Sequence, residues 1–217
     1  KRKSYPLFSI YQASLTNYRY HPIDEKDNKS TSFFFSAVEK NTQRKVLIKK
    51  FNKGLDKFHE FDAESYALEN LNQENIIKPI GIFEDDEYNY IVLPYAEGGD
   101  LFDFIYSKRI SFNNNQLKQT AFYILSALEK IHSKGIIYRD IKLENIVLSK
   151  YYDELPENFN NDDLILIDFG SCYIKSKSES LAKFRGTNYY RAPEYIFHQK
   201  VTEKYDIFSL GILLYYL

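Results

Sequence analysis

The sequence predicts an α+β fold in two parts, a small part rich in strands with one main helix and a larger, mainly helical part. Two observations support this prediction. Up to residue 93, short runs of aromatic and β-branched residues are separated by polar turns, which is typical of strands. Beyond Pro94 and the pair Gly98-Gly99, apolar residues recur with helical spacing. We therefore expect the small part to span residues 1–96 and the large part residues 97–217.

Four strands are predicted in the small part, as two pairs. The first pair flanks a polar turn at residues 41–44, and the second flanks an acidic turn at residues 84–87. Each run is rich in residues that favour extended backbone. The predicted strands cover residues 33–38, 45–51, 76–83 and 88–93.

A helix is predicted over residues 55–72, and its apolar face carries a carboxylate. Glu64 lies three residues after Phe61 and four before Leu68, so it shares their face. Burying a carboxylate is costly unless it is paired, and Lys49 is the candidate partner. The alternative is that Glu64 lies in water at the edge of the helix. The apolar face comprises Phe58, Phe61, Ala67, Leu68 and Leu71.

The strongest helical pattern of the large part covers residues 115–133, and Gly135 follows as its natural end. Two short apolar runs, residues 145–148 and 164–167, predict a small hairpin with a long acidic and asparagine-rich connector between them. Residues 207–217 are apolar but too few to span a bilayer, so a buried helix is expected there. The apolar face of the first helix comprises Leu117, Ala121, Ile124, Leu125, Leu128 and Ile131.

Composition excludes some classes of function. The formal net charge of -1 gives no general attraction to nucleic acid or membrane surfaces. The one cysteine, Cys172, excludes an internal disulfide and suits a reducing compartment, so we expect the cytoplasm and leave the nucleus open. Cys172 is either an ordinary small side chain, the favoured interpretation, or a reactive thiol. The chain has no methionine and ends inside an apolar segment, so it is expected to be a fragment of a longer protein.

Four short motifs occur in a fixed order: VLIK at residues 46–49, YRDIKLEN at 138–145, DFG at 168–170 and GTNYYRAPE at 186–194. One tripeptide is weak evidence, but the ordered set is specific. Together the motifs resemble the signature set of eukaryotic-type protein kinases, from about Phe33 to the last residue. The resemblance implies a two-lobed kinase fold, truncated within the large lobe, that uses ATP and Mg²⁺ to phosphorylate a protein substrate. It also leaves room for a regulatory protein as a partner.

The resemblance favours the serine/threonine branch and leaves the subfamily open. Lys142 and Thr187 are more similar to that branch than to the tyrosine branch. Tyr138 and residues 97–102 resemble the calcium/calmodulin-like and related branches, whereas residues 190–194 are commoner in the cyclin-dependent branch. A small-molecule kinase ranks low, because residues 186–194 resemble a platform for binding a peptide.

The resemblance assigns four residues to the chemistry of phosphoryl transfer, which needs metal ligands, charge neutralisation and an oriented hydroxyl. Asp140 would accept or orient the proton of the substrate hydroxyl. Lys142 would neutralise charge on the γ-phosphate. Asn145 and Asp168 would hold Mg²⁺. The alternative is an ordinary polar turn followed by a strand.

The segment that links the two lobes resembles the kinase hinge. Leu93 aligns with the gatekeeper position, and the carbonyl of Pro94 and the amide of Ala96 would face the adenine edge. Proline keeps its carbonyl, so no adenine contact is lost there. Val147 is expected to contact the nucleotide as well. Asp100 would bind the ribose or begin a helix, and the sequence favours neither.

The phosphate-binding part of the resemblance is incomplete. Lys49, oriented by Glu64, would hold the α- and β-phosphates, and this ion pair would form only when the helix is swung in. The glycine-rich loop over the phosphates is missing, and no glycine occurs before Gly54. Glycines matter there because the backbone must approach the phosphates closely. The usual glycine positions fall at Asp27, Lys29 and Ser32.

At two further positions, which usually pack against the two faces of adenine, the side chain is larger than in the family. Phe34 stands where a valine is usual, and Leu47 stands where an alanine is usual. The added bulk is expected to weaken nucleotide binding, although every metal ligand and the candidate base remain. These departures motivate an alternative function: a pseudokinase that acts as an interaction or allosteric module with weak or absent turnover.

Overall fold

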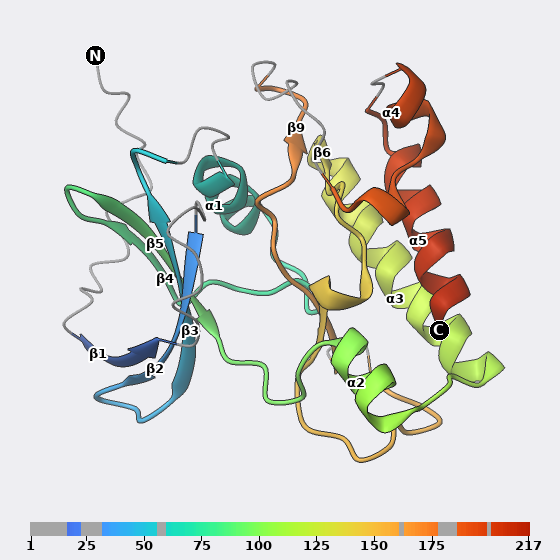
Figure 1. Cartoon of the computed structure of the whole chain (residues 1–217), viewed down its shortest axis with the longest axis horizontal. Helices are drawn as coiled ribbons and strands as arrows, with labels where there is room; N and C mark the ends of the chain where they lie inside the picture. Colours follow the sequence, from blue (N-terminus) through green and yellow to red (C-terminus); the bar gives the residue numbers. More distant parts are fainter. Residues whose placement is uncertain (1–16, 23–31, 56–59, 161–162, 178–185, 199–200) are drawn as a thin grey trace. The chain divides into compact units, whose positions relative to one another are not determined.

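The computed structural model of the chain describes residues 17–22, 32–55, 60–160, 163–177, 186–198 and 201–217 (Figure 1). By packing, the chain divides into two compact units. One comprises Lys1–Phe61 and Lys78–Tyr95, and the other Asp62–Ile77 and Ala96–Leu217. The predicted α+β class is confirmed, because the first unit is built on a curled five-stranded sheet and the second is mostly helical.

Residues 62–77, assigned from sequence to the small lobe, pack with the second unit. The Ile77 amide donates to the Leu166 carbonyl at 3.0 Å, and the Asn75 side-chain amide donates to the Tyr123 carbonyl at 2.6 Å. The division into lobes at residues 96 and 97 stays a prediction.

The sheet of the first unit is antiparallel throughout, in the order β1-β2-β3-β5-β4. All four predicted strands are present, three of them within two residues of their expected ends. Pairing across the sheet places Ile48 opposite Phe35 on one side and Val92 on the other. The strands are β1 (Tyr18–Pro22), β2 (Ser32–Glu39), β3 (Lys45–Asn52), β4 (Gly81–Glu84) and β5 (Tyr88–Pro94).

Two features of this sheet differ from the prediction. The strand β1 was not expected. The strand expected over residues 76–83 is reduced to β4, because Pro79 has no amide to donate to a ladder and Ile76 instead forms an isolated bridge with Leu166. The predictions for Asp27, Lys29 and Phe58 concern residues outside those that the structure describes.

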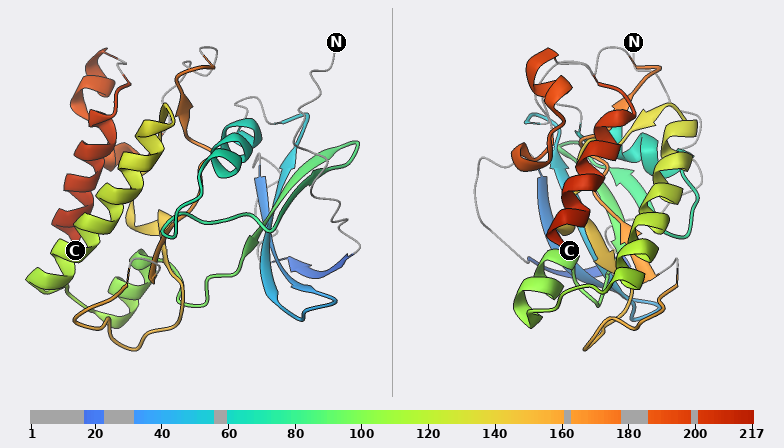
Figure 2. Two further views of the ribbon diagram at one scale, coloured as in Figure 1. Left: turned by 180° about the vertical axis from the view of Figure 1, so that it is seen from behind. Right: turned by 90° about the vertical axis from the view of Figure 1, so that its right-hand side faces the viewer.

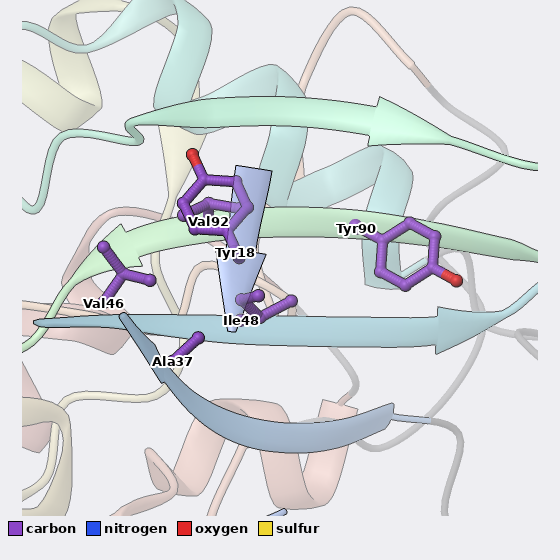
Figure 3. Packing of buried hydrophobic residues seen from close by; sticks show 6 residues of the cluster. All are labelled: Tyr18, Ala37, Val46, Ile48, Tyr90 and Val92. Atoms are coloured by element: carbon purple, nitrogen blue, oxygen red, sulfur yellow. The ribbon is translucent and has the colours of Figure 1, made fainter. Parts of the chain in front are cut away.

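One face of the sheet carries a buried apolar cluster, which Figure 3 shows in close view. Successive side chains of a strand point to opposite faces. Val46 and Ile48 of β3 lie in the cluster, so Lys49 projects from the other face of the sheet. The labelled members of the cluster are Tyr18, Ala37, Val46, Ile48, Tyr90 and Val92.

Helix α1 (Glu60–Asn70) carries the buried carboxylate that the sequence predicts. Glu64 is fully buried, so the interpretation that places it in water at the helix edge is wrong. Ala67, Leu68 and Leu71 are buried as predicted. Phe61 also packs edge-on against the ring of Phe51, with their centroids 5.5 Å apart.

Helix α3 (Asn114–Ser133) is the longest of the second unit and has both ends fixed by local chemistry. Asn113 and Gln116 form a capping box at its start, and Gly135 adopts a left-handed φ of 69° just past its end. The predicted face is rotated slightly, because Leu125 is 44% exposed whereas Thr120 is fully buried. The buried residues are Gln116, Thr120, Ile124, Ala127, Leu128 and Ile131.

Helix α5 (Lys204–Tyr216) lies beside α3 (Figures 1 and 2). The expectation of a buried helix holds for one face only: Leu210 and Leu213 are buried, but Ile207 is 47% exposed and Tyr215 is 86% exposed. Two shorter helices, α2 (Leu101–Lys108) and α4 (Pro193–His198), also belong to the second unit. Among the described residues, no helix is long and apolar enough to cross a membrane.

The predicted hairpin is confirmed as β7 (Ile146–Leu148) paired with β8 (Leu164–Leu166). A second pair joins β6 (Ile136–Ile137) to β9 (Tyr173–Ile174). The connector at residues 149–163 is fastened to α3 by side-chain amides: Gln116 donates to the carbonyls of Leu155 and Pro156, at 2.8 and 3.2 Å. The pairing of β6 with β9 holds the chain just before residues 138–145, and the pairing of β7 with β8 holds it just after them.

Candidate active site

The loop at residues 138–145 is held by one buried carboxylate, Asp206, near the start of α5. Its oxygens accept the Tyr138 amide at 2.9 Å and the Arg139 amide at 2.7 Å. His132 Nε2, in the last turn of α3, lies 2.7 Å from the same carboxylate. Arg139 has a left-handed φ of 67°, a conformation that carries strain and is maintained here by these bonds. The loop backbone is therefore fixed by a carboxylate of α5, which is itself held by His132 of α3.

Three polar residues meet at Asp140, which is only 7% exposed. Asp140 Oδ1 accepts both the amide of Thr187, at 3.0 Å, and its hydroxyl, at 2.9 Å. Asp140 Oδ2 accepts from Asn145 Nδ2 at 2.9 Å and lies 3.2 Å from Lys142 Nζ. Lys142 Nζ also donates to the Thr187 hydroxyl at 3.2 Å. The four side chains form one network around a single carboxylate.

Asn145 is oriented so that its amide oxygen suits a cation. Its nitrogen Nδ2 donates to the backbone carbonyl of Asp140 and to the Asp140 carboxylate, each at 2.9 Å. This leaves Oδ1 as the atom that can bind a metal. The expected metal ligands are a carboxylate oxygen of Asp168 and the amide oxygen of Asn145. Together with oxygen atoms of water and phosphate, they would form the all-oxygen ligand set that Mg²⁺ prefers. No group of three His, Cys, Asp or Glu residues among the described ranges could hold a metal by itself.

The segment at residues 168–170 is tied to the loop through its backbone. The Ile167 amide donates to the Asn145 carbonyl at 3.0 Å, and the Tyr138 hydroxyl donates to the Ile167 carbonyl. Tyr138 and Phe169 pack edge-on, with their centroids 5.1 Å apart. Complete burial, reinforced by the charges of Asp140 and Asp168, raises the pKa of Tyr138 well above its usual value. The hydroxyl therefore stays a donor, and it fixes the residue that precedes Asp168.

Close packing brings Thr187 to Asp140. Gly186 has a φ of 86°, and a Cβ added there would lie 2.4 Å from the Arg139 carbonyl oxygen. Arg191 donates two bonds to the Gly186 carbonyl, at 2.9 and 2.6 Å. Because a side chain at position 186 would collide with backbone, glycine is required for this approach.

The predicted nucleotide-binding residues are divided between the two units. Asp100 accepts a hydrogen bond from the Asp103 amide at 2.8 Å and so caps the start of α2. The interpretation of Asp100 as the start of a helix is thus confirmed, whereas its contact with ribose stays a prediction. Glu64 and Lys49 are both buried. The first unit contains Lys49, Leu93 and Pro94, and the second contains Glu64, Ala96, Asp100 and Val147. Their joint role in binding ATP stays a prediction.

The sequence did not predict three contacts of this site: those of His132 with Asp206, of Tyr138 with Ile167, and of Thr187 with Asp140. The first and third join residues 74 and 47 positions apart. The only sequence feature that could have indicated the contact of His132 is its position in the last turn of a predicted helix.

Cys172 is expected to resist alkylation in the folded protein. The thiol is 2% exposed, and burial, together with the charge of Asp206, raises its pKa well above the usual value, so the reactive thiolate is suppressed. Mass spectrometry after iodoacetamide treatment at pH 8 should show an unmodified cysteine in the native protein and full modification in 6 M guanidinium. Rapid labelling of the native protein would instead support the reactive-thiol interpretation.

Comparison with known proteins agrees with the order of the motifs and with this geometry. A family model described as a protein kinase domain matches residues 30–217. The chain belongs to the protein kinase family. The resemblance and the two-part α+β fold inferred from the sequence are thus confirmed.

Relatives of this kinase domain include a calcium-dependent protein kinase and two serine/threonine-protein kinases. It is 36% identical over 174 residues to calcium-dependent protein kinase 6 of Plasmodium berghei (strain Anka), covering 80% of this chain and 11% of the relative. It is 32% identical over 195 residues to serine/threonine-protein kinase 33 of Mus musculus, covering 87% and 39%. It is 36% identical over 167 residues to the Drosophila melanogaster serine/threonine-protein kinase CG17528, covering 76% and 21%. The chain thus spans less than half the length of each of these relatives.

Proposed function

We propose that this kinase domain transfers the γ-phosphoryl group of ATP to a serine or threonine hydroxyl of a protein substrate. The observation that carries the proposal is the network around Asp140. Its carboxylate is nearly buried, and it is fixed by Thr187, Asn145 and Lys142. A carboxylate held in one orientation beside an ammonium group suits the acceptance of a hydroxyl proton next to developing phosphate charge.

The proposed roles follow from the atoms that each residue presents. Asp140 orients the incoming hydroxyl and takes its proton. Lys142, which already lies against both Asp140 and Thr187, is within reach of a phosphate oxygen placed beside them. Mg²⁺, held by Asp168 and Asn145 Oδ1, would neutralise the charge of the ATP phosphates. Asp206 acts at a distance, by holding the loop backbone on which Asp140 stands.

For the nucleotide we propose the contacts that the family resemblance implies. Lys49, oriented by Glu64, holds the α- and β-phosphates. The adenine contacts are proposed for Leu93, Pro94, Ala96 and Val147, and a ribose contact for Asp100.

A pseudokinase is the second candidate function, and the observation that favours it is the position of Phe34. This ring lies on β2 directly opposite Lys49, at a position usually occupied by a much smaller side chain. Together with the absence of glycine before Gly54, it would weaken nucleotide binding without removing any ligand of the metal.

Binding of MgATP separates the two candidates when combined with turnover. If MgATP binds, the unfolding free energy should rise by about 2.7 kcal/mol at a hundredfold excess over Kd. The measurement is a thermal-shift titration of the intact protein, with Mg²⁺ alone and ATP with EDTA as controls. Labelled-phosphate incorporation into a serine/threonine peptide array is assayed in parallel. A shift with incorporation supports the kinase; a shift without incorporation supports the pseudokinase; no shift at millimolar MgATP contradicts nucleotide binding altogether.

A further inference from the structure

The ammonium group of Lys49 lies between two aromatic rings of its own sheet. The register of β2 against β3 places Phe34 directly opposite Lys49. Lys49 Nζ lies 5.4 Å from the ring centroid of Phe34 and 5.2 Å from that of Phe51, two residues farther along β3. Both distances fall within the range of a cation–π interaction. We call Phe34 and Phe51 the aromatic clamp.

The two rings of the clamp differ in how firmly they are held. Phe51 is fully buried and is braced by the edge-on ring of Phe61. Phe34 is 39% exposed and can be replaced without opening the core. Lys49 is only 4% exposed, so its contacts with these rings are largely shielded from water. Cation–π attraction is stronger where water is excluded.

The neighbouring lysine provides an internal comparison. Lys50 projects from the opposite face of β3, where its Nζ lies 3.5 Å from the ring centroid of Tyr88. Each face of β3 thus has its own pair of a lysine and an aromatic ring. A change in Tyr88 tests the general effect of removing an aromatic ring from this sheet, and a change in Phe34 tests the clamp.

We propose that Phe34 is a positioning residue for Lys49. The proposal rests on the proposed function, in which Lys49 holds the ATP phosphates. A lysine side chain has a flexible four-carbon stem, and its ammonium must be ordered before it can grip a phosphate. The clamp restricts the ammonium to the space between two ring faces, in addition to the other interactions of Lys49. It supplies order at a place where the glycine-rich loop is missing. On this view the bulk of Phe34 is an adaptation for phosphate binding and not an obstruction.

Two probes separate phosphate binding from adenine binding. Adenosine reports only on the base and sugar, so the ratio of the Kd for adenosine to the Kd for MgATP measures what the phosphates add. We expect Phe34→Leu, which keeps apolar bulk but loses the ring, to lower this ratio about two- to thirtyfold, the range from exposed to desolvated cation–π contacts. Phe34→Tyr should keep the wild-type ratio, and so should Tyr88→Leu. Calorimetry of the intact protein gives both constants, after thermal melts confirm that each variant is folded.

An unchanged ratio in Phe34→Leu would overturn the proposal. If the ratio stays constant because the affinities for adenosine and MgATP rise by the same factor, Phe34 is a simple obstruction. If the wild-type protein binds no MgATP, the proposed function fails, and the role of the clamp toward phosphates fails with it.

A second measurement needs no nucleotide, so it tests the clamp independently of the proposed function. Ring currents from Phe34 and Phe51 should move the Hε proton resonance of Lys49 upfield in a proton–carbon correlation spectrum. Phe34→Leu should move this resonance back toward that of a solvated lysine, whereas Phe34→Tyr and Tyr88→Leu should leave it in place. An Hε resonance of Lys49 that is identical in wild type and Phe34→Leu would show that the clamp does not exist in solution.

Discussion

Replacing Asp140 with asparagine is expected to lower phosphate incorporation by about a hundred- to ten-thousandfold, the usual contribution of a positioned acid or base. The variant keeps the shape of the side chain but removes the negative charge and replaces one of the two acceptor oxygens by a donor nitrogen. The amide of the new residue would also face Asn145 Nδ2 and Lys142 Nζ, which are both donors. The rate of transfer should therefore fall much more than the affinity for MgATP.

The experiment compares initial rates of labelled-phosphate transfer by the intact protein, with the Kd for MgATP measured by calorimetry on the same samples. Glu154→Gln is a matched control, because it neutralises an exposed carboxylate in the connector, outside the loop. Wild-type turnover in Asp140→Asn would show that Asp140 is not the base and would remove the main support for the catalytic proposal.

Replacing Asp206 with alanine is expected to destabilise the second unit by about 3–5 kcal/mol. The carboxylate is fully buried, and its loss leaves the buried amides of Tyr138 and Arg139 without their acceptor. Such a loss is a large fraction of the stability of a typical domain. Urea unfolding followed by circular dichroism gives the change in free energy, with Asp153→Ala as a control at an exposed aspartate.

The milder variant Asp206→Asn separates stability from activity. One oxygen remains to accept a backbone amide, so the protein should stay folded at low temperature while the loop loses part of its anchor. We expect a lower rate of phosphate transfer with little change in the Kd for MgATP, because Asp206 is a positioning residue for Asp140. Full activity in a folded Asp206→Asn variant would mean that the loop holds its conformation without this carboxylate.

The sequence predicts elements well where the signals are local. Helix α3 begins and ends within one residue of its predicted bounds, because an asparagine cap and a glycine stop flank it. Strand β3 is extended by one residue beyond its expected end. The fully buried Glu64 was also expected from its position on an apolar face.

Strands and side-chain contacts that depend on partners far along the chain are predicted poorly from the sequence. Strand β1 has five residues and is defined only by its pairing with β2. Ile76 forms an isolated bridge with Leu166 instead of continuing a strand, and nothing near Ile76 indicates that partner. At the site, motif order places Asp140 and Asn145 in one loop, but the contact of Asp140 with Thr187 depends on a tight approach at Gly186.

The fastening of the connector at residues 149–163 has a consequence for how its sequence can diverge. Gln116 and Tyr123 of α3 donate to main-chain carbonyls of the connector, at Leu155, Pro156 and Phe159. Two side chains of the connector also contact α3, the amide of Asn158 and the ring of Phe159, and neither is acidic. Main-chain groups are common to every amino acid. Related chains could thus exchange most of the exposed acidic residues of this segment and keep its path. Among the residues of the connector that the structure describes, Leu155 and Phe159 have buried apolar side chains and would have to remain apolar.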